Sequence, residues 1–334
     1  MTLPGVLSRS SLQSPDVAPR SRTGANNGLA RRLARAAAVG TVAGGSGVAY
    51  GWLEARWFRV RERRVPVLPP GAAPLRVLHL TDVHLTPYQR RKRAWLASLV
   101  DLRPDLVVST GDSLAHPGAV TPLMEALGGL TQVPGVFVLG SNDYFAPTAK
   151  NPVRYLLPDD GTRRNGPRRL PFADLVARFR AAGWTDLSNR RGSLTVRGVR
   201  IAFAGVDDPH MSYDDLDAVA GPADPAADLR LGVSHAPYLR VLDRFATDGY
   251  DLILAGHTHG GQLCLPGGQA LVTNCDIDRE RASGLHRHPA RSRPGEPGSS
   301  WLHVSAGAGT SPYAVVRVCC RPEAVLLELV ARDA

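Results

Sequence analysis

Cysteine is scarce in this chain, with four among 334 residues. Cys319 and Cys320 are adjacent, and Cys264 and Cys275 stand at spacings that match neither a zinc motif nor a disulfide framework. The sequence therefore argues against a structural thiolate zinc site and against a small disulfide-stabilised domain. The fold must instead depend on a hydrophobic core, for which the chain has ample length.

The chain also lacks a strong motif for a serine or cysteine nucleophile, so nothing in it supports covalent catalysis. Its formal net charge is +10, and a positive charge attracts nucleic acid and anionic membranes. No interleaving of basic and aromatic residues, and no known nucleic-acid-binding motif, accompanies that charge. We therefore expect no nucleic-acid partner.

What the chain does have is a pair of histidines after an apolar run. Residues 250–255 have the length of a strand and are followed by Gly256-His257-Thr258-His259-Gly260-Gly261. Glycines on both sides of the histidines allow a sharp turn and a close approach of the backbone. Two histidines that leave the end of one strand favour a metal site, and they need further ligands from elsewhere in the chain.

Polar side chains also follow four other short apolar runs. Helical patterns lie between several of these runs, as in a parallel or mixed sheet covered by helices. The runs and their polar residues are Leu75–Leu80 with Asp82 and His84, Leu106–Ser109 with Asp112, Gly135–Leu139 with Asn142 and Asp143, and Leu229–Val233 with His235. The helical patterns are Arg91–Leu102, Val120–Leu127, Phe172–Ala182 and Pro237–Thr247. Ligands of open α/β sheets gather at the carboxyl ends of strands, so we expect these side chains to converge.

A further polar group, Asp207-Asp208-Pro209-His210, follows the apolar run Ile201–Val206. We interpret it as a turn, because Asp and Pro are favoured in turns. The alternative is a position beside the ligands or facing the substrate.

The expected ligand set is made of carboxylate, imidazole and amide groups, which suit Mn, Fe or Zn. Its seven members are too many for one catalytic ion with an open position: Asp82, His84, Asp112, Asn142, His235, His257 and His259. They suit two divalent ions that share a bridging carboxylate. Such a pair can lower the pKa of a bridging water and stabilise an in-line displacement at phosphorus, which needs no protein nucleophile.

The polar motifs at the strand ends resemble, in order and in spacing, those of the calcineurin-like metallophosphoesterases. The motifs are Asp82-x-His84, Gly111-Asp112, residues 140–143, His235 and Gly256-His257-x-His259. The resemblance covers about residues 75–330, with the segment 304–311 and strands near Ala314–Val318 and Ala324–Val330. It implies an α/β fold in which two mixed sheets form a sandwich with helices outside, in the order α/β/β/α. The chain also resembles a membrane-associated bacterial subgroup, some members of which are labelled UDP-2,3-diacylglucosamine pyrophosphatase-like.

The resemblance implies a role for each candidate residue. The first ion would be held by Asp82, His84 and His259, the second by His235 and His257 with an amide oxygen of residues 140–143, and Asp112 would bridge the two. Catalysis would depend on Asp112, Asn142, Asp143 and His257.

One motif departs from the family pattern, which reads Gly-Asn-His followed by Asp or Glu. This chain has Gly140-Ser141-Asn142-Asp143. Without a gap, Ser141 takes the place of the metal-binding Asn, and Asn142 that of the His beside the scissile phosphate. With a slip of one residue, Asn142 remains a ligand and Asp143 replaces the His as the acid. We favour Asn142 as the ligand because its amide oxygen reaches further than a hydroxyl, and the family's His is missing in either case.

The N-terminal part predicts a membrane anchor in front of the catalytic domain. Residues 1–30 have the composition of a disordered tail. Residues 31–57 contain the uncharged run Ala36–Leu53, which is just long enough to cross a bilayer, with Trp52 and Trp57 at its far end. Residues 58–74, with four prolines, predict a stiff linker to a metallophosphoesterase domain at 75–334. Arginines flank the run on both sides, so the orientation stays open.

The expected function is that of a dimetal phosphoesterase anchored in the cell membrane by one N-terminal segment. Its substrate would be a phosphorylated small molecule, a nucleotide sugar or a lipid-linked molecule, in which a metal-bridging hydroxide attacks a phosphoester or pyrophosphate bond. The alternative is a weakened homologue with a metal-dependent ligand-binding or regulatory role, which the altered residues 140–143 keep open.

Overall fold

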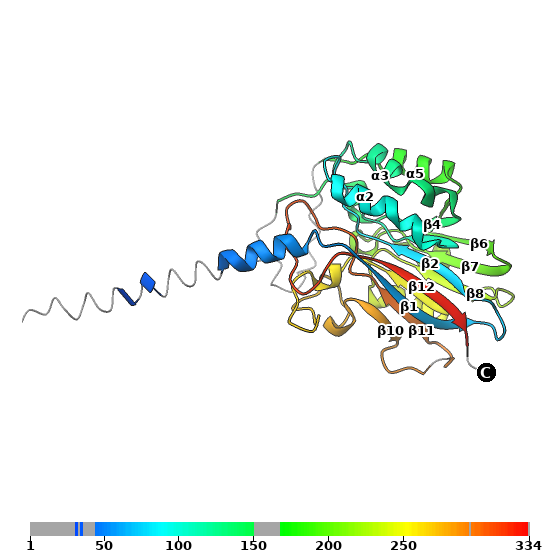
Figure 1. Cartoon of the computed structure of the whole chain (residues 1–334). Coiled ribbons are helices and arrows are strands. Elements are labelled where there is room, and N and C mark those ends of the chain that lie inside the picture. Colours follow the sequence, from blue (N-terminus) through cyan, green and yellow to red (C-terminus); the bar gives the residue numbers. More distant parts are fainter. Residues whose placement is uncertain (1–30, 33, 36–43, 150–167, 294, 333–334) are drawn as a thin grey trace, which may run out of the picture. The chain divides into compact units, whose positions relative to one another are not determined.

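Two six-stranded mixed sheets lie face to face and enclose a cluster of buried apolar residues (Figure 1). The computed structural model describes residues 31–32, 34–35, 44–149, 168–293 and 295–332. The chain divides into two units, residues 1–47 and residues 48–334, and both sheets belong to the second.

The first sheet has the strand order β1-β12-β2-β3-β4-β5. Its strands are β1 (Arg59–Leu68), β12 (Glu323–Ala331), β2 (Leu75–Leu80), β3 (Leu106–Ser109), β4 (Gly135–Phe137) and β5 (Thr185–Asp186). All neighbours are parallel except β12 and β2. The carboxyl ends of β2, β3 and β4 therefore lie at the same edge of this sheet.

The second sheet has the strand order β10-β11-β9-β8-β7-β6. Its strands are β10 (Gly284–His288), β11 (Ser300–Val304), β9 (Leu252–Ala255), β8 (Leu229–Val233), β7 (Val199–Gly205) and β6 (Arg190–Val196). The outermost pair at each edge is antiparallel and the inner pairs are parallel. Because β7, β8 and β9 are parallel, their carboxyl ends lie together at one edge of this sheet.

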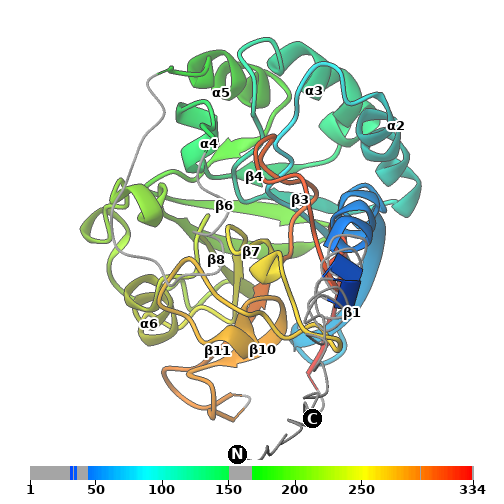
Figure 2. The same cartoon turned by 90° about the vertical axis from the view of Figure 1, so that its left-hand side faces the viewer.

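Helices cover the outer face of each sheet (Figure 2). The α-helices of this unit that lie after β2 are α2 (Arg90–Ser98), α3 (Val120–Leu127), α4 (Ser141–Tyr144), α5 (Phe172–Ala181) and α6 (Leu239–Thr247). One apolar cluster joins α2, α3 and α5 to the first sheet, and another joins α6 to the second. The layers therefore follow the predicted order α/β/β/α.

The inner strands are mostly apolar because both of their faces are buried. In β2, Val77 belongs to the cluster between the sheets and Leu78 to the cluster under the helices. In β9, Leu252 and Leu254 face the other sheet, whereas Ile253 faces α6. This alternation is the two-residue period of a strand.

Two predicted elements differ from the structure. Residues 59–68 are not a linker, because they form β1, a parallel partner of β12 at the edge of the first sheet. Pro66 is tolerated there because an edge strand does not need every backbone N–H for pairing. The predicted strand Ala314–Val318 is irregular apart from one bridge between Val318 and Leu263, whereas the strand expected near Ala324–Val330 is β12.

The predicted disordered tail and part of the predicted membrane span lie outside the described residues, at 1–30 and 36–43. Within the residues that are described, no helix has the length and apolar character needed to cross a membrane.

Candidate metal centre

The loops after the ligand-bearing strands hold five candidate ligands in the left-handed region of backbone conformation. Their φ angles lie between 44° and 68°: Asp82, His84, Asp112, His257 and His259. Such conformations cost about 1–3 kcal/mol per residue and are found mainly at functional sites. Each strand therefore ends in a strained turn that directs its polar side chain toward the other strand ends.

Two glycines make the close approach of these turns possible. A Cβ atom on Gly140 would collide with the Asp112 carboxylate and with the His235 ring. A Cβ atom on Gly256 would collide with Thr81 and with Asp82 Oδ2. Any larger residue at either position would force the carboxylates away from the histidines.

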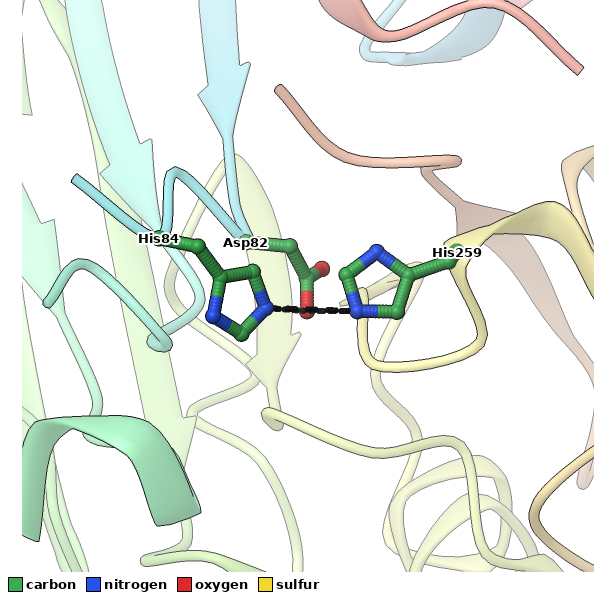
Figure 3. Close-up of side chains that lie close together, drawn as sticks. All are labelled: Asp82, His84 and His259. Atoms are coloured by element: carbon green, nitrogen blue, oxygen red, sulfur yellow. Dashed lines mark hydrogen bonds and ion pairs between the residues drawn. The ribbon is translucent and has the colours of Figure 1, made fainter. Parts of the chain in front are cut away.

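The first group of converging side chains is Asp82, His84 and His259 (Figure 3). Asp82 Oδ1 lies 3.9 Å from His84 Nε2 and 3.7 Å from His259 Nε2, and the two Nε2 atoms are 3.2 Å apart. The other oxygen of Asp82 accepts hydrogen bonds from Thr81 Oγ1 and from the backbone N–H of His257. Asp82 Oδ1 is buried and has no hydrogen-bond partner among the described residues, so it is available to a cation.

The second group is Asp82, Asp112 and His235. Asp112 lies between the two groups, with Oδ2 3.5 Å from His84 Nε2 and Oδ1 3.6 Å from His235 Nε2. His257 adjoins this group, since its Nδ1 lies 3.2 Å from His235 Nε2. A carboxylate with one oxygen toward each group has the position of a bridging ligand.

Burial holds most of the imidazoles neutral. It lowers the pKa of His84, His257 and His259 well below the usual value for histidine, and neighbouring cationic groups lower it further. Neutral imidazole is the form that binds metal. Burial also raises the pKa of Asp82 to about 6, although His235 partly opposes this effect.

His235 differs from the other histidines. Burial would lower its pKa, but the carboxylates of Asp112, Asp208 and Asp82 outweigh burial and raise that pKa to about 9. Its Nδ1 lies 2.7 Å from the carbonyl oxygen of Thr110, which fixes the ring with Nε2 toward Asp112. In the metal-free protein, His235 therefore carries the positive charge that balances the carboxylates.

These residues fit a pair of divalent ions. Buried carboxylate oxygens and imidazole nitrogens face one another at 3.2–3.9 Å, and two of the atoms, Asp82 Oδ1 and His257 Nε2, have no other partner among the described residues. A ligand set without thiolates suits Mn, Fe or Zn.

Asn142 lies beside the candidate bridging ligand. Its backbone N–H donates to Asp112 Oδ1 over 2.7 Å, and its amide nitrogen lies 2.8 Å from Asp112 Oδ2 and 3.2 Å from Ser141 Oγ. The two atoms of an amide group are assigned from such contacts, so a rotated amide would put its oxygen at the same place. Both Ser141 and Asn142 thus reach the group around Asp112.

Asp143, the predicted catalytic acid, does not face the other candidate residues. The side chain is fully buried, and its carboxylate accepts hydrogen bonds from four backbone N–H groups: those of Gly140, Asp112, Ser113 and Leu114. The carboxylate therefore has no free position for a hydrogen bond to a substrate. Asp143 instead joins the turn after β3 to the turn after β4.

Asp208 and His210 belong to the surroundings of the metal centre. The expected turn is present as a short 3-10 helix, Pro209–Met211, which the Asp208 side chain caps. The turn places the His210 ring 4.3 Å from that of His257, and burial raises the pKa of Asp208 to about 7. The signal in the sequence was the position of this turn after β7, the strand next to β8.

Metal binding is expected to release protons and to strengthen as the pH rises. Below pH 9 the metal-free His235 is protonated, and coordination must displace that proton. The affinity of the group containing His235 should therefore rise about tenfold per pH unit between pH 7 and pH 9, and then level off. Calorimetry with Mn²⁺ in buffers of different ionisation enthalpy would count the released protons, and a pH-independent affinity without proton release would contradict the assignment.

Comparisons with known proteins identify a family and several relatives of this chain. The family model described as calcineurin-like phosphoesterase matches residues 75–261. The chain is similar to phosphodiesterase YaeI of Escherichia coli, with 27% identity over 90% of this chain and 100% of that protein. It is also similar to an uncharacterized metallophosphoesterase of Aquifex aeolicus, with 28% identity over 69% of this chain and 81% of that protein. Among solved structures, the 5′-nucleotidase precursor of Thermus thermophilus shares 14% identity and a TM-score of 0.39, over 77% of this chain and 55% of that one.

Proposed function

The chain belongs to the calcineurin-like phosphoesterase family and is a metal-dependent phosphoric ester hydrolase, and we propose that it cleaves phosphodiesters. The observation that carries the proposal is the Asp112 carboxylate, which has one oxygen near His84 and the other near His235. The choice of a diester is supported by the similarity to a protein described as a phosphodiesterase.

The distances between these side chains support the ligand roles proposed from the sequence. Asp82, His84 and His259 would hold one ion, and His235 and His257 the other, with Asp112 between them and Asn142 or Ser141 completing the second set. Two ions held in this way would supply the Lewis acidity that activates a water molecule and neutralises charge on the phosphoryl group. The protein itself orients these ligands, keeps the imidazoles of His84, His257 and His259 neutral, and excludes water from Asp82 and His235, which are fully buried.

A comparison of matched aryl phosphates tests the substrate class. With Mn²⁺ present, bis(p-nitrophenyl) phosphate should be hydrolysed with a higher kcat/KM than p-nitrophenyl phosphate. A preference for the monoester would contradict the proposed diesterase activity but would leave the metal-dependent hydrolysis intact.

His210 is proposed to take over part of the work of the histidine missing from residues 140–143. Its ring lies beside His257, and its Nδ1 is 3.1 Å from the hydroxyl of Tyr238, which fixes the ring at the edge of the site. A hydrogen bond to the leaving oxygen or to the phosphoryl group is worth about 10²-fold in rate.

Replacing His210 by Phe should keep the ring packing but lower kcat about 10²-fold for a diester with an alkyl leaving group. The loss should be smaller for a p-nitrophenyl leaving group, which departs with little assistance. Tyr238→Phe is the matched control, since it removes only the group that positions the ring, and its effect should be weaker. Equal losses on both substrates, or a loss of bound metal, would show that His210 only supports His257.

We further propose that the substrate is lipid-linked or is a nucleotide sugar and that the enzyme works at the cell membrane. The support is the uncharged run Ala36–Leu53, with exposed Trp52 and Trp57 at its far end. Expression of the full chain and of residues 48–334 in the same cells tests the anchor. The full chain should sediment with membranes after a high-salt wash, and recovery of both proteins in the soluble fraction would contradict it.

A further inference from the structure

A cavity of about 140 Å³ lies at the N-terminal end of α2, apart from the metal ligands. Three segments that are distant in the sequence form its wall: residues 55–58, residues 89–92 and the loop 310–315. Three of the lining side chains are cationic, namely Arg56, Arg91 and Lys92, and none is acidic. Thr310 and Ser311 add hydroxyl groups.

Lys92 is a buried cation without a carboxylate partner. The residue is only 5% exposed, and its Nζ donates to the carbonyl oxygen of Val83 over 2.7 Å. None of the ion pairs between described residues includes it. Burial, together with the nearby charges of Arg317 and Arg56, lowers the pKa of its ammonium group to about 7. A buried ammonium group among other cations is costly unless an anion balances it.

The first turn of α2 has the opposite charge from that which a helix N-terminus favours. Its sequence is Arg90-Arg91-Lys92-Arg93, no acidic residue is present in the turn, and Gln89 provides no side-chain cap. The N-terminus of a helix carries partial positive charge and free N–H groups, so cations there are unfavourable and anions are stabilised. Arg93 pairs with Glu125 outside the cavity, whereas Arg91 has no ion pair among the described residues.

Arg56 faces the same cavity from the other side. Its guanidinium carbon lies 3.8 Å from the centre of the Trp52 ring, and its Nη1 donates to the carbonyl oxygen of Trp52. No carboxylate of the described residues pairs with it. The planar guanidinium thus keeps donors available for a phosphate, a geometry that arginine suits better than lysine.

We propose that this cavity is a binding site for a phosphate group, formed by the N-terminus of α2 with Lys92, Arg91 and Arg56 and by the hydroxyls of Thr310 and Ser311. It would adjoin the metal centre, because Val83, the residue that Lys92 contacts, lies between Asp82 and His84 in the chain. The site is separate from the hydrolytic machinery, and its occupation does not require hydrolysis.

A phosphate group could come from a phospholipid headgroup or from a soluble phosphate, and exposed side chains around the cavity favour the lipid. Val315, which lines it, is 40% exposed, and Tyr313 and Trp57, neighbours of lining residues in the chain, are 54% and 56% exposed. Aromatic and apolar side chains beside arginines are typical of surfaces that meet a lipid interface.

The test is calorimetric titration of the full-length protein with monomeric dihexanoyl phosphatidylglycerol, with dihexanoyl phosphatidylcholine and with inorganic phosphate. The double variant Arg56→Gln/Arg91→Gln should bind the anionic lipid about 30-fold more weakly than the wild type, since each interfacial arginine contributes about fivefold. The matched control, Arg291→Gln/Arg200→Gln, removes the same charge from exposed arginines that neither line the cavity nor belong to α2, and it should change the affinity less than about threefold.

Two results support the site and identify its ligand. A selective loss for phosphatidylglycerol, with no binding of inorganic phosphate, indicates a lipid headgroup. Binding of inorganic phosphate that is lost in the first double variant and kept in the control indicates a soluble phosphate. Equal effects of the two double variants, or equal binding of the zwitterionic lipid, would overturn the proposal.

The outcome is separable from that of the proposed hydrolysis. An Asp112→Asn protein should bind phosphatidylglycerol through the cavity with the same sensitivity to Arg56→Gln/Arg91→Gln, because Asp112 does not line it. If the protein turns over substrate with metal but does not bind the lipid, only the phosphate site is rejected. If it binds the lipid but shows no metal-dependent turnover, only the proposed reaction is rejected.

Discussion

Replacing Asp112 by Asn should lower the metal-dependent kcat for bis(p-nitrophenyl) phosphate by about 10³-fold. The carboxylate stands between His84 and His235, at 3.5 and 3.6 Å from their Nε2 atoms. An amide has one oxygen, so it can approach only one of the two ligand groups. Loss of about 4 kcal/mol of charge stabilisation is the expected size of such a defect.

The same substitution should also change the metal content. Purified Asp112→Asn protein is expected to bind one equivalent of Mn²⁺ or less where the wild type binds two, as measured by elemental analysis after gel filtration. The effect on kcat should exceed that on KM, because the ions act on the transition state rather than on substrate binding alone.

Asp105→Asn is a suitable control for this experiment. Asp105 immediately precedes β3, at the opposite end of the strand from Asp112, where its carboxylate accepts a hydrogen bond from the backbone of Arg76 and pairs with exposed Arg197. Its replacement should leave turnover and metal content unchanged. Wild-type turnover in the Asp112→Asn protein would remove the basis for a dimetal mechanism, and the alternative of a binding or regulatory role for the centre would regain support.

The elements that the sequence predicted best are those whose own residues decide their structure. The predicted strand Leu229–Val233 and helix Val120–Leu127 coincide with β8 and α3. Both are short segments whose apolar side chains recur with the period of the element and are buried in the apolar clusters. Local pattern and tertiary packing agree there, so the local pattern suffices.

The elements that the sequence did not predict depend on partners far along the chain. β1 alternates arginine with apolar residues and contains a proline, and it becomes a strand only through pairing with β12 near the other terminus. The apolar segment Ala314–Val318 fails to become a strand because other groups use its backbone. The Gln262 amide donates to the carbonyls of Ala314 and Val316, and the N–H of Arg317 donates to Gly51.

The candidate site, like the fold, could be predicted from the sequence only in part. Residues that follow strands could be assigned to one edge from the order of the motifs, because parallel strands end together. The direction of a side chain within a turn could not be assigned in this way. Asp143 and Asn142 are neighbours on one short helix, yet Asn142 reaches Asp112 at the site and Asp143 turns away to backbone donors.

The Asp143 side chain points away from the site toward backbone donors, and this leads to a prediction about stability. Asp143→Asn should lower the free energy of unfolding by about 2–6 kcal/mol, because the amide nitrogen cannot accept the two backbone hydrogen bonds that one carboxylate oxygen accepts now. Each buried donor left without an acceptor costs about 1–3 kcal/mol. The corresponding fall in the midpoint of thermal unfolding is on the order of 10 °C.

The exposed pair of Asp174 with Arg178 provides the control, since Asp174→Asn should change the unfolding free energy by less than about 0.5 kcal/mol. Thermal unfolding of the metal-free proteins by circular dichroism compares the two variants without the contribution of bound ions. The loss of turnover in Asp143→Asn should follow the displacement of Asp112, and excess Mn²⁺ should partly restore it. An Asp143→Asn protein that unfolds at the wild-type temperature, binds two ions and has lost activity only on poor leaving groups would instead restore Asp143 as the acid, since a clamp between two turns cannot be removed without a cost in stability.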